Sequence, residues 1–263
     1  MSSTLRADPL VELGRFRDAV QFLTRLPVPP ARVHDPAWLV RSAKYFPLVG
    51  LLVGAVGAGV LLLAGQIWSG ALPALLATAA TLLLTGALHE DGLADTADSL
   101  GGSTREKRLA IMKDSRLGTF GAAALGLTLA AKVTALAALP PAVAAAALLA
   151  MHAGGRLAAI LVMAALPHAT GLGDSRSSHS PDRMSGGEVA AAMLLACPAF
   201  WLLGPGLAAA GLAGGGVCAL GLAIAARRLF GGYTGDVLGA AEQVFEIGLV
   251  LTVSALLEHA WAM

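Results

Sequence analysis

Residues 89–121 read HEDGLADTADSLGGSTREKRLAIMKDSRLGTFG and lie between two apolar runs that are long enough to cross a lipid bilayer. Five acidic residues fall within the first eighteen positions of this stretch: Glu90, Asp91, Asp95, Asp98 and Glu106. If the helix of the preceding apolar run continues straight into the stretch, Asp91, Asp95 and Asp98 lie within roughly 60° of one another on one face. Carboxylates on one such stripe repel each other unless a positive charge lies between them. The spacing therefore favours a hard divalent cation with oxygen ligands.

The alternative interpretation of this acidic stripe is a solvated helix end without a ligand. Two features favour a site. The stripe follows directly on the apolar run 71–88, where a carboxylate without a function is costly. It is followed by Gly101 and Gly102, and then by a basic segment. The cations of that segment are Arg105, Lys107, Arg108, Lys113 and Arg116. Carboxylates beside glycines and cations suit a phosphate-bearing substrate, so we predict the active site here.

Composition predicts an integral membrane protein. Of the 263 residues, 56% are hydrophobic and only 13% are charged, and the mean hydropathy is +0.72. A soluble domain carries about a quarter charged residues. The formal net charge of +1 gives no bulk attraction to nucleic acid. Cys197 and Cys218 both lie in apolar runs, which predicts buried free thiols and no disulfide framework.

Apolar runs predict an all-α bundle of about seven transmembrane helices with an active site at its cytoplasmic face. The runs are residues 47–65, 71–88, 118–139, 141–166, 188–204, 206–226 and 244–262. Pro140-Pro141 and the segment 204–206 predict tight turns between neighbouring spans. Gly50, Gly54 and Gly57 permit close packing between helices in lipid.

The sequence predicts two parts: a cytoplasmic N-terminal segment at residues 1–46 and a polytopic transmembrane catalytic domain at residues 47–263. The N-terminal segment holds seven of the eighteen lysines and arginines. Apolar residues recur at helical spacing from Pro9 to Thr24, which predicts a short amphipathic helix that lies on the membrane surface or packs on the protein. Prolines at 27, 29 and 30 end this helix.

Charge in the connections predicts the orientation. The N-terminal segment and the loops 89–117, 167–187 and 227–243 hold sixteen of the eighteen lysines and arginines, and only Lys132 and Arg156 fall elsewhere. By the positive-inside rule, these four segments are cytoplasmic, and the C-terminus is expected outside. Lys132 either snorkels or neutralises a carboxylate. Arg156, in an apolar run, is a candidate for a substrate phosphate.

Other candidate residues lie on the same side of the membrane. Asp114 could bind a metal ion and Arg116 could hold a phosphate. The alternative is that Asp114 caps a helix and Arg116 faces lipid. Asp236 opens the last apolar run as a metal ligand or a helix cap, and Gln243 lies two helical turns later on the same face. The acidic residues Glu242 and Glu246 are further candidates for metal ligands. The loop residues Arg176, His179 and Ser180 could contact substrate or belong to a simple connector.

Five motifs together carry a resemblance to a known family. They are FLTRLPVP (22–29), YFPLVG (45–50), HEDGLADTADSLGG (89–102), MKDSRLGTFG (112–121) and GDVLGA (235–240). In this combination, which spans nearly the whole chain, the sequence closely resembles cobalamin synthase, the adenosylcobinamide-GDP ribazoletransferase family. The resemblance implies a Mg²⁺-dependent enzyme of the bacterial inner membrane. It would join adenosylcobinamide-GDP to α-ribazole, or to α-ribazole 5′-phosphate, with release of GMP.

The resemblance implies roles for particular residues. Mg²⁺ would be held by Asp91, Asp95 and Asp98, with Asp114 as a further ligand. Arg116 would neutralise phosphate oxygens, and Glu90, rather than His89, would accept the hydroxyl proton. The residues expected to contact substrate are Gly92, Gly101, Gly102, Lys113, Arg156, Asp236 and Gln243. The expected partners are the two substrates and the lipid bilayer; a homo-oligomer, or association with other enzymes of nucleotide-loop assembly, stays open.

Two other classes of membrane protein fit the sequence less well. A membrane CDP-alcohol phosphotransferase also places aspartates on helices at the cytosolic face, but its Asp-Gly is followed by Ala-Arg. Here Ala94 is followed by Asp95. An ion-coupled transporter would carry carboxylates near the middle of the bilayer and matching halves. The acidic residues of the central stretch cluster at one membrane edge, and no halves match.

Overall fold

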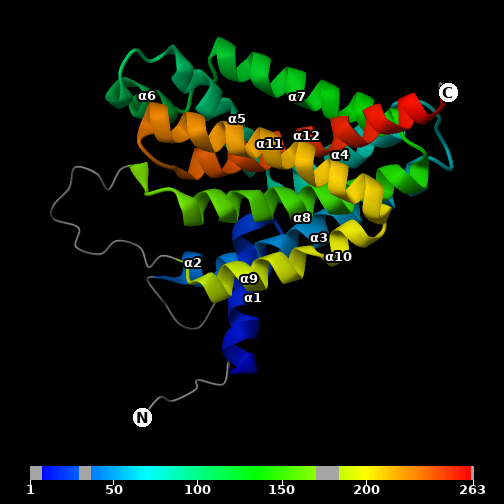
Figure 1. The fold of residues 1–263 in the computed structure, drawn as a ribbon, viewed down its shortest axis with the longest axis horizontal. Coiled ribbons are helices and arrows are strands. Elements are labelled where there is room, and N and C mark those ends of the chain that lie inside the picture. Colours follow the sequence, from blue (N-terminus) through cyan, green and yellow to red (C-terminus); the bar gives the residue numbers. More distant parts are fainter. Residues whose placement is uncertain (1–7, 30–36, 170–183, 262–263) are drawn as a thin grey trace.

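The computed structural model describes residues 8–29, 37–169 and 184–261, and within these ranges the chain forms helices and no strand. The protein is an all-α integral membrane protein (Figure 1). The helices are α1 (Pro9–Leu23), α2 (Trp38–Ala43), α3 (Phe46–Ala64), α4 (Leu72–Thr85), α5 (Leu88–Asp98), the 3₁₀ turn η1 (Ser99–Gly101), α6 (Arg105–Met112), α7 (Thr119–Ala138), α8 (Pro141–Ala165), α9 (Gly186–Ala196), α10 (Pro198–Trp201), α11 (Gly204–Phe230) and α12 (Gly235–Trp261).

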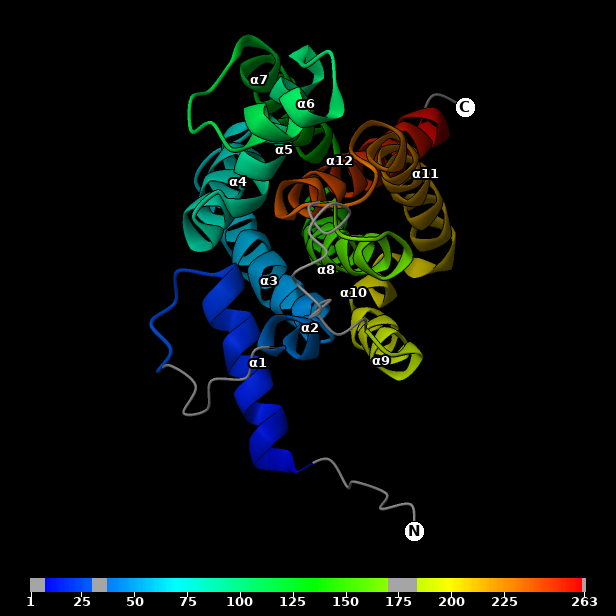
Figure 2. The ribbon, with the colours of Figure 1, turned by 90° about the vertical axis from the view of Figure 1, so that its left-hand side faces the viewer.

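Helix α8 lies in the middle of the bundle, with α3, α12 and α11 around it (Figure 2). It contains mostly alanine and glycine, and much of its length is buried. Gly50 and Gly54 of α3 lie directly on the backbone of α8. A Cβ at Gly54 would come within 2.6 Å of the Leu148 carbonyl oxygen. The prediction that these glycines allow close helix packing is confirmed.

Among the described residues, five helices are long and apolar enough to cross a membrane by length and composition: α3, α7, α8, α11 and α12. A bent pair, α4 with α5, gives a sixth candidate. The fifth predicted run, 188–204, is divided between α9 and α10, because Pro198 begins a new helix directly after Cys197. The segment Gly186–Trp201 is therefore a shorter apolar helical stretch, so the expected seven full spans become five or six.

The chain bends by 90° between α4 and α5. Gly86 and Ala87 both adopt left-handed backbone conformations, with φ values of 67° and 57°. This conformation ends a right-handed helix. The prediction that the acidic stripe extends straight from the apolar run is therefore wrong. The stripe lies on a separate helix, α5, which crosses α12 instead of extending α4.

Helix α12 begins at Gly235, nine residues before the apolar run predicted at 244–262. The Thr234 hydroxyl caps it by accepting a hydrogen bond from the Val237 amide at 3.2 Å. Asp236 is therefore in the first turn and is not the N-cap. Gly92 of α5 packs against this turn, where a Cβ would come within 2.8 Å of the Asp236 carbonyl oxygen. The close approach brings the starts of α5 and α12 together.

Helix α1 forms over almost the predicted residues and extends away from the bundle (Figure 2). Ala19, Val20 and Leu23 are buried against α2 and α3. Leu10 and Leu13, in the outer half, are exposed. The inner half thus packs on the protein, and the outer half retains an apolar surface suited to the membrane interface.

Candidate active site

Three carboxylates lie in the same region, where α5 crosses the start of α12. The negative charges of Asp91, Asp98 and Asp236 repel the carboxylate of Asp95. The carboxylate of Asp236 is likewise repelled by that of Asp91. No lysine or arginine among the described residues forms an ion pair with Asp91, Asp95 or Asp236. We call these three residues the edge carboxylates. Their repulsion is uncompensated by protein charge, which is the electrostatic condition that a cation relieves.

Asp98, the last residue of the acidic stripe, has partners in the protein. Its Oδ2 accepts a hydrogen bond from the Gly118 amide at 2.7 Å, and its Oδ1 accepts one from the Gly121 amide at 2.8 Å. Gly118 and Gly121 belong to the first turn of α7, whose N-terminal amides have no partner within the helix. Asp98 therefore caps α7 from a neighbouring helix and links the acidic segment to the RLGTFG motif.

We predict that Asp98→Asn destabilises the protein by about 1–2 kcal/mol, the usual cost of losing a helix cap. An asparagine keeps one acceptor oxygen and turns an NH₂ group toward one of the two amides. The free energy of unfolding in detergent measures the loss. Asp91→Asn is the matched control, because Asp91 is exposed and accepts no such bond. Equal stability of the two variants would contradict the capping role.

Deeper in the bundle, α5, α7, α8 and α12 share a second group of polar side chains, which we call the buried network. Its members are His89, Glu90, Lys132, His152, Arg156, Glu242, Gln243 and Glu246, and all are buried. The Glu242 carboxylate lies 2.8 Å from the Arg156 guanidinium and 2.9 Å from His89 Nε2. Glu246 receives Lys132 at 2.6 Å. Glu242 and Glu246, inside the bundle, thus have cationic partners, whereas the edge carboxylates have none among the described residues.

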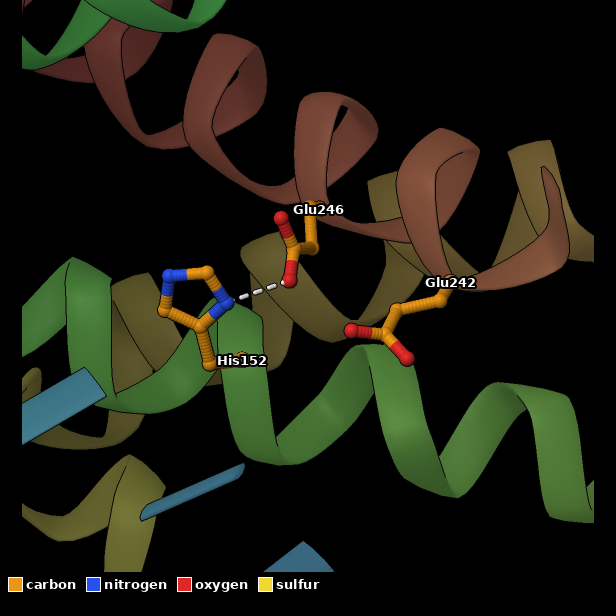
Figure 3. A group of neighbouring side chains, drawn as sticks. All are labelled: His152, Glu242 and Glu246. Carbon is orange, nitrogen blue, oxygen red and sulfur yellow. Dashed lines mark ion pairs between the residues drawn. The ribbon is translucent and has the colours of Figure 1, made fainter. Parts of the chain in front are cut away.

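His152, Glu242 and Glu246 are close enough together to suggest a metal site (Figure 3). Their ligand atoms lie within 4.8 Å of one another, the only such group of three in the described ranges; neither Asp91, Asp95 and Asp98 nor the three edge carboxylates converge so closely. His152 Nδ1 approaches Glu246 Oε1 to 2.6 Å, without the alignment of a hydrogen bond. However, Lys132 and Arg156 already balance both glutamates. A divalent ion here would add charge without neutralising any, so the edge carboxylates are the better cation site.

In the structure, Lys132 and Arg156 each form an ion pair with a glutamate of α12. Lys132 neutralises Glu246, which decides between the two predicted roles. Arg156 is only 1% exposed and pairs with Glu242, so the structure does not place it at an open phosphate site. The sequence contains a signal for this arrangement. His152 and Arg156 are four residues apart on one span, as Glu242 and Glu246 are on another, and opposite charges in two apolar spans indicate a cross-helix pair.

Asp114 and Arg116 lie outside the group of edge carboxylates. Arg116 donates to Asp114 at 3.0 Å through Nε, and its side chain is 87% exposed. This hydrogen bonding lowers the pKa of Asp114 to about 2, so the carboxylate stays ionised at neutral pH. Lys113 is exposed at the end of α6. The pair occupies the loop between α6 and α7, where Arg116 is open to an incoming ligand.

The glycines predicted to face substrate differ in their surroundings. Gly101 has open space where a side chain would stand, whereas Gly102 is buried against Arg108. Gly92 serves the crossing of α5 and α12. The candidate loop residues Arg176, His179 and Ser180 lie outside the described residues. The two cysteines are free, but both are exposed on the surface of the bundle, and the prediction of buried thiols is wrong.

An apolar pocket of about 220 Å³ lies between α5, α11 and α12. Its lining includes Leu93, Leu100, Leu229 and Phe230. Thr96 is the one residue of the lining with a polar side chain, and no charged residue lines the pocket. The polar chemistry of the site therefore belongs to the edge carboxylates and the loop before α7.

Together, the fold and these residues define a class: a polytopic membrane protein with carboxylates that have no cationic partner where two described helices cross. The chain matches the family model of cobalamin-5-phosphate synthase (CobS) over residues 15–254. It belongs to that family.

Curated relatives agree with this assignment. A protein of Leptothrix cholodnii named adenosylcobinamide-GDP ribazoletransferase is 43% identical over 249 residues, which cover 91% of this chain and 94% of the relative. Proteins with the same name from Bradyrhizobium diazoefficiens and Vibrio cholerae are 43% and 38% identical and cover 92% and 94% of this chain, and 94% and 96% of their own lengths. No solved structure matches the chain.

Proposed function

We propose that this protein joins adenosylcobinamide-GDP to α-ribazole, or to α-ribazole 5′-phosphate, and releases GMP. The family match over nearly the whole chain is the observation that carries the assignment. The ribazole hydroxyl oxygen forms a bond to the phosphorus atom next to the cobinamide arm. The bond from that phosphorus to the GMP oxygen breaks, and the hydroxyl proton passes to a base. Such reactions depend mainly on positioning and on neutralising negative charge.

The edge carboxylates fit a magnesium ion, which we propose as the cofactor. They offer hard oxygen donors without histidine or cysteine, and no described cation pairs with them. Asp91, Asp95 and Asp236 would hold the ion, with Asp98 close by as a cap of α7. A bound Mg²⁺ would neutralise diphosphate oxygens and stabilise the leaving GMP.

Other side chains supply the remaining functions. Arg116, whose guanidinium is exposed, would hold a non-bridging phosphate oxygen with a two-pronged hydrogen bond. Glu90 remains the proposed proton acceptor, because its Oε2 is buried and has no hydrogen-bond partner. It directly precedes Asp91 in α5, so the acceptor and the cation site share one helix.

The assignment is tested with purified protein in detergent or lipid nanodiscs. Incubation with adenosylcobinamide-GDP, α-ribazole and Mg²⁺ should yield GMP and adenosylcobalamin in equal amounts. Omission of α-ribazole is the control for simple hydrolysis of the diphosphate. Release of GMP at the same rate without α-ribazole, or formation of no cobalamin, would contradict the transferase assignment.

We also propose that the site faces the cytoplasm of a bacterial inner membrane, because the lysines and arginines concentrate on that side of the bundle. In a chain without Cys197 and Cys218, a cysteine at Ser103 should react with an impermeant thiol reagent only from the cytoplasmic side. A cysteine at Ser69, in the short connection before α4, should react only from outside. Labelling of both from one side would overturn the orientation of α3 and α4.

A further inference from the structure

Two adjacent residues of α5 are tied to two adjacent residues of α12 inside the bundle. His89 Nε2 lies 2.9 Å from Glu242 Oε2. In the next pair, Gln243 Nε2 donates to Glu90 Oε1 at 3.1 Å. Both pairs are buried. On α5, Glu90 directly precedes the edge carboxylate Asp91, and on α12, Gln243 follows the edge carboxylate Asp236 by two helical turns.

Lys132 fixes the direction in which Gln243 points. The lysine ammonium donates to Gln243 Oε1 at 2.9 Å and to Glu246 Oε2 at 2.6 Å. An ammonium group can only donate, whereas an amide has one accepting and one donating end. The Gln243 oxygen therefore faces Lys132, and its NH₂ group must face Glu90. A flipped amide would set donor against donor at one end and oxygen against carboxylate at the other.

These contacts fix the position of α12 along α5 and contribute little to the neutralisation of charge. Glu246 is already balanced by Lys132 and Glu242 by Arg156. Gln243 is neutral, and both ends of its amide are used. Its one connection to α5 is Glu90, the residue before an edge carboxylate. A shift of α12 along α5 would break both cross-helix pairs and separate Asp236 from Asp91 and Asp95.

We propose that Gln243, oriented by Lys132, is a positioning residue that sets the register of α12 against α5 and thereby the geometry of the cation site. This role rests on the proposed function and replaces the direct substrate contact predicted for Gln243. His89 and Glu242 form the second cross-link of the same register. Groups that orient metal ligands commonly change metal affinity by about 10–100-fold when they are altered.

The test measures the dissociation constant of Mn²⁺, used as a paramagnetic probe for Mg²⁺, by the loss of the free-ion resonance signal. Gln243→Glu places a carboxylate against Glu90 and should raise the dissociation constant by about 10–100-fold. Adding Glu90→Gln to this variant reverses the pair. The amide introduced on α5 then donates to the carboxylate introduced on α12, while Lys132 still donates to that same carboxylate. The double variant should bind Mn²⁺ nearly as tightly as the wild type.

Rescue by the reversed pair separates positioning from a general loss of folding. Thr81→Val is the matched control, because Thr81 is buried and its hydroxyl donates only within α4; it should leave the dissociation constant unchanged. If Gln243→Glu does not fold, Gln243→Asn, which shortens the amide by one methylene, should weaken Mn²⁺ binding in the folded protein. Wild-type affinity in the folded position-243 variants, or no rescue by the double variant, would overturn the register role. Failure of the wild type itself to bind Mn²⁺ would instead overturn the metal in the proposed function, and the register role with it.

Discussion

Asp91→Asn and Asp95→Asn should each lower turnover by about two orders of magnitude or more, corresponding to at least roughly 2.7 kcal/mol in the activation free energy. Asparagine keeps the size and hydrogen bonding of aspartate but removes the charge that a hard cation requires. At least one of the two variants should recover part of its activity at high Mg²⁺ or with Mn²⁺, because mass action can offset weaker binding. Steady-state formation of adenosylcobalamin measures both effects.

Asp18→Asn is the control for this pair, because Asp18 lies on α1, away from the edge carboxylates. Its turnover should equal that of the wild type. Each inactive variant must also elute from detergent as a single folded species. Near-normal turnover in folded Asp91→Asn and Asp95→Asn would show that the acidic helix is only a solvated surface.

Arg156→Met should destabilise the protein by about 3–5 kcal/mol, because it leaves Glu242 as a buried charge that lacks its guanidinium partner. Adding Glu242→Gln should recover much of this loss, since the double variant removes both charges. The free energy of unfolding in detergent measures the single variants and the pair. A double-mutant cycle isolates the interaction between the two side chains.

The same cycle decides what Arg156 does. If Arg156 contacts a substrate phosphate, Arg156→Met should fold with nearly wild-type stability and raise the KM for adenosylcobinamide-GDP. That result would contradict the structural pairing with Glu242. A large loss of stability that Glu242→Gln repairs would support it.

The sequence predicts the helical class and several contacts because these follow from local patterns. Apolar runs predict the spans, and the glycines at 50 and 54 predict a close helix contact. The 90° bend could not be read in the same way. Gly86 is a recognisable helix terminator, but the next residue, Ala87, also takes a left-handed conformation, and only tertiary packing selects that conformation for alanine.

The contacts of the individual acidic side chains could not be predicted from the sequence. Helical spacing predicts that Asp91, Asp95 and Asp98 share one face, and it is silent on what each side chain meets. In the structure, Asp98 caps α7, while Asp236, about 140 residues later in the chain, lies near Asp91 and Asp95. The deep pairs of Lys132 with Glu246 and Arg156 with Glu242 likewise join residues of different helices. Opposite charges in apolar spans indicate that such cross-helix pairs form, but the packing of the bundle decides which residues pair.

Binding of Mn²⁺ to the wild type, Asp95→Asn and Asp236→Asn tests most directly whether α5 and α12 together hold the cation. The wild type should bind Mn²⁺, Mg²⁺ should displace it, and each variant should bind at least about tenfold more weakly. The comparison needs no substrate, so it separates metal binding from catalysis. Wild-type affinity in folded Asp95→Asn and Asp236→Asn would contradict the assignment of the cation site to the edge carboxylates.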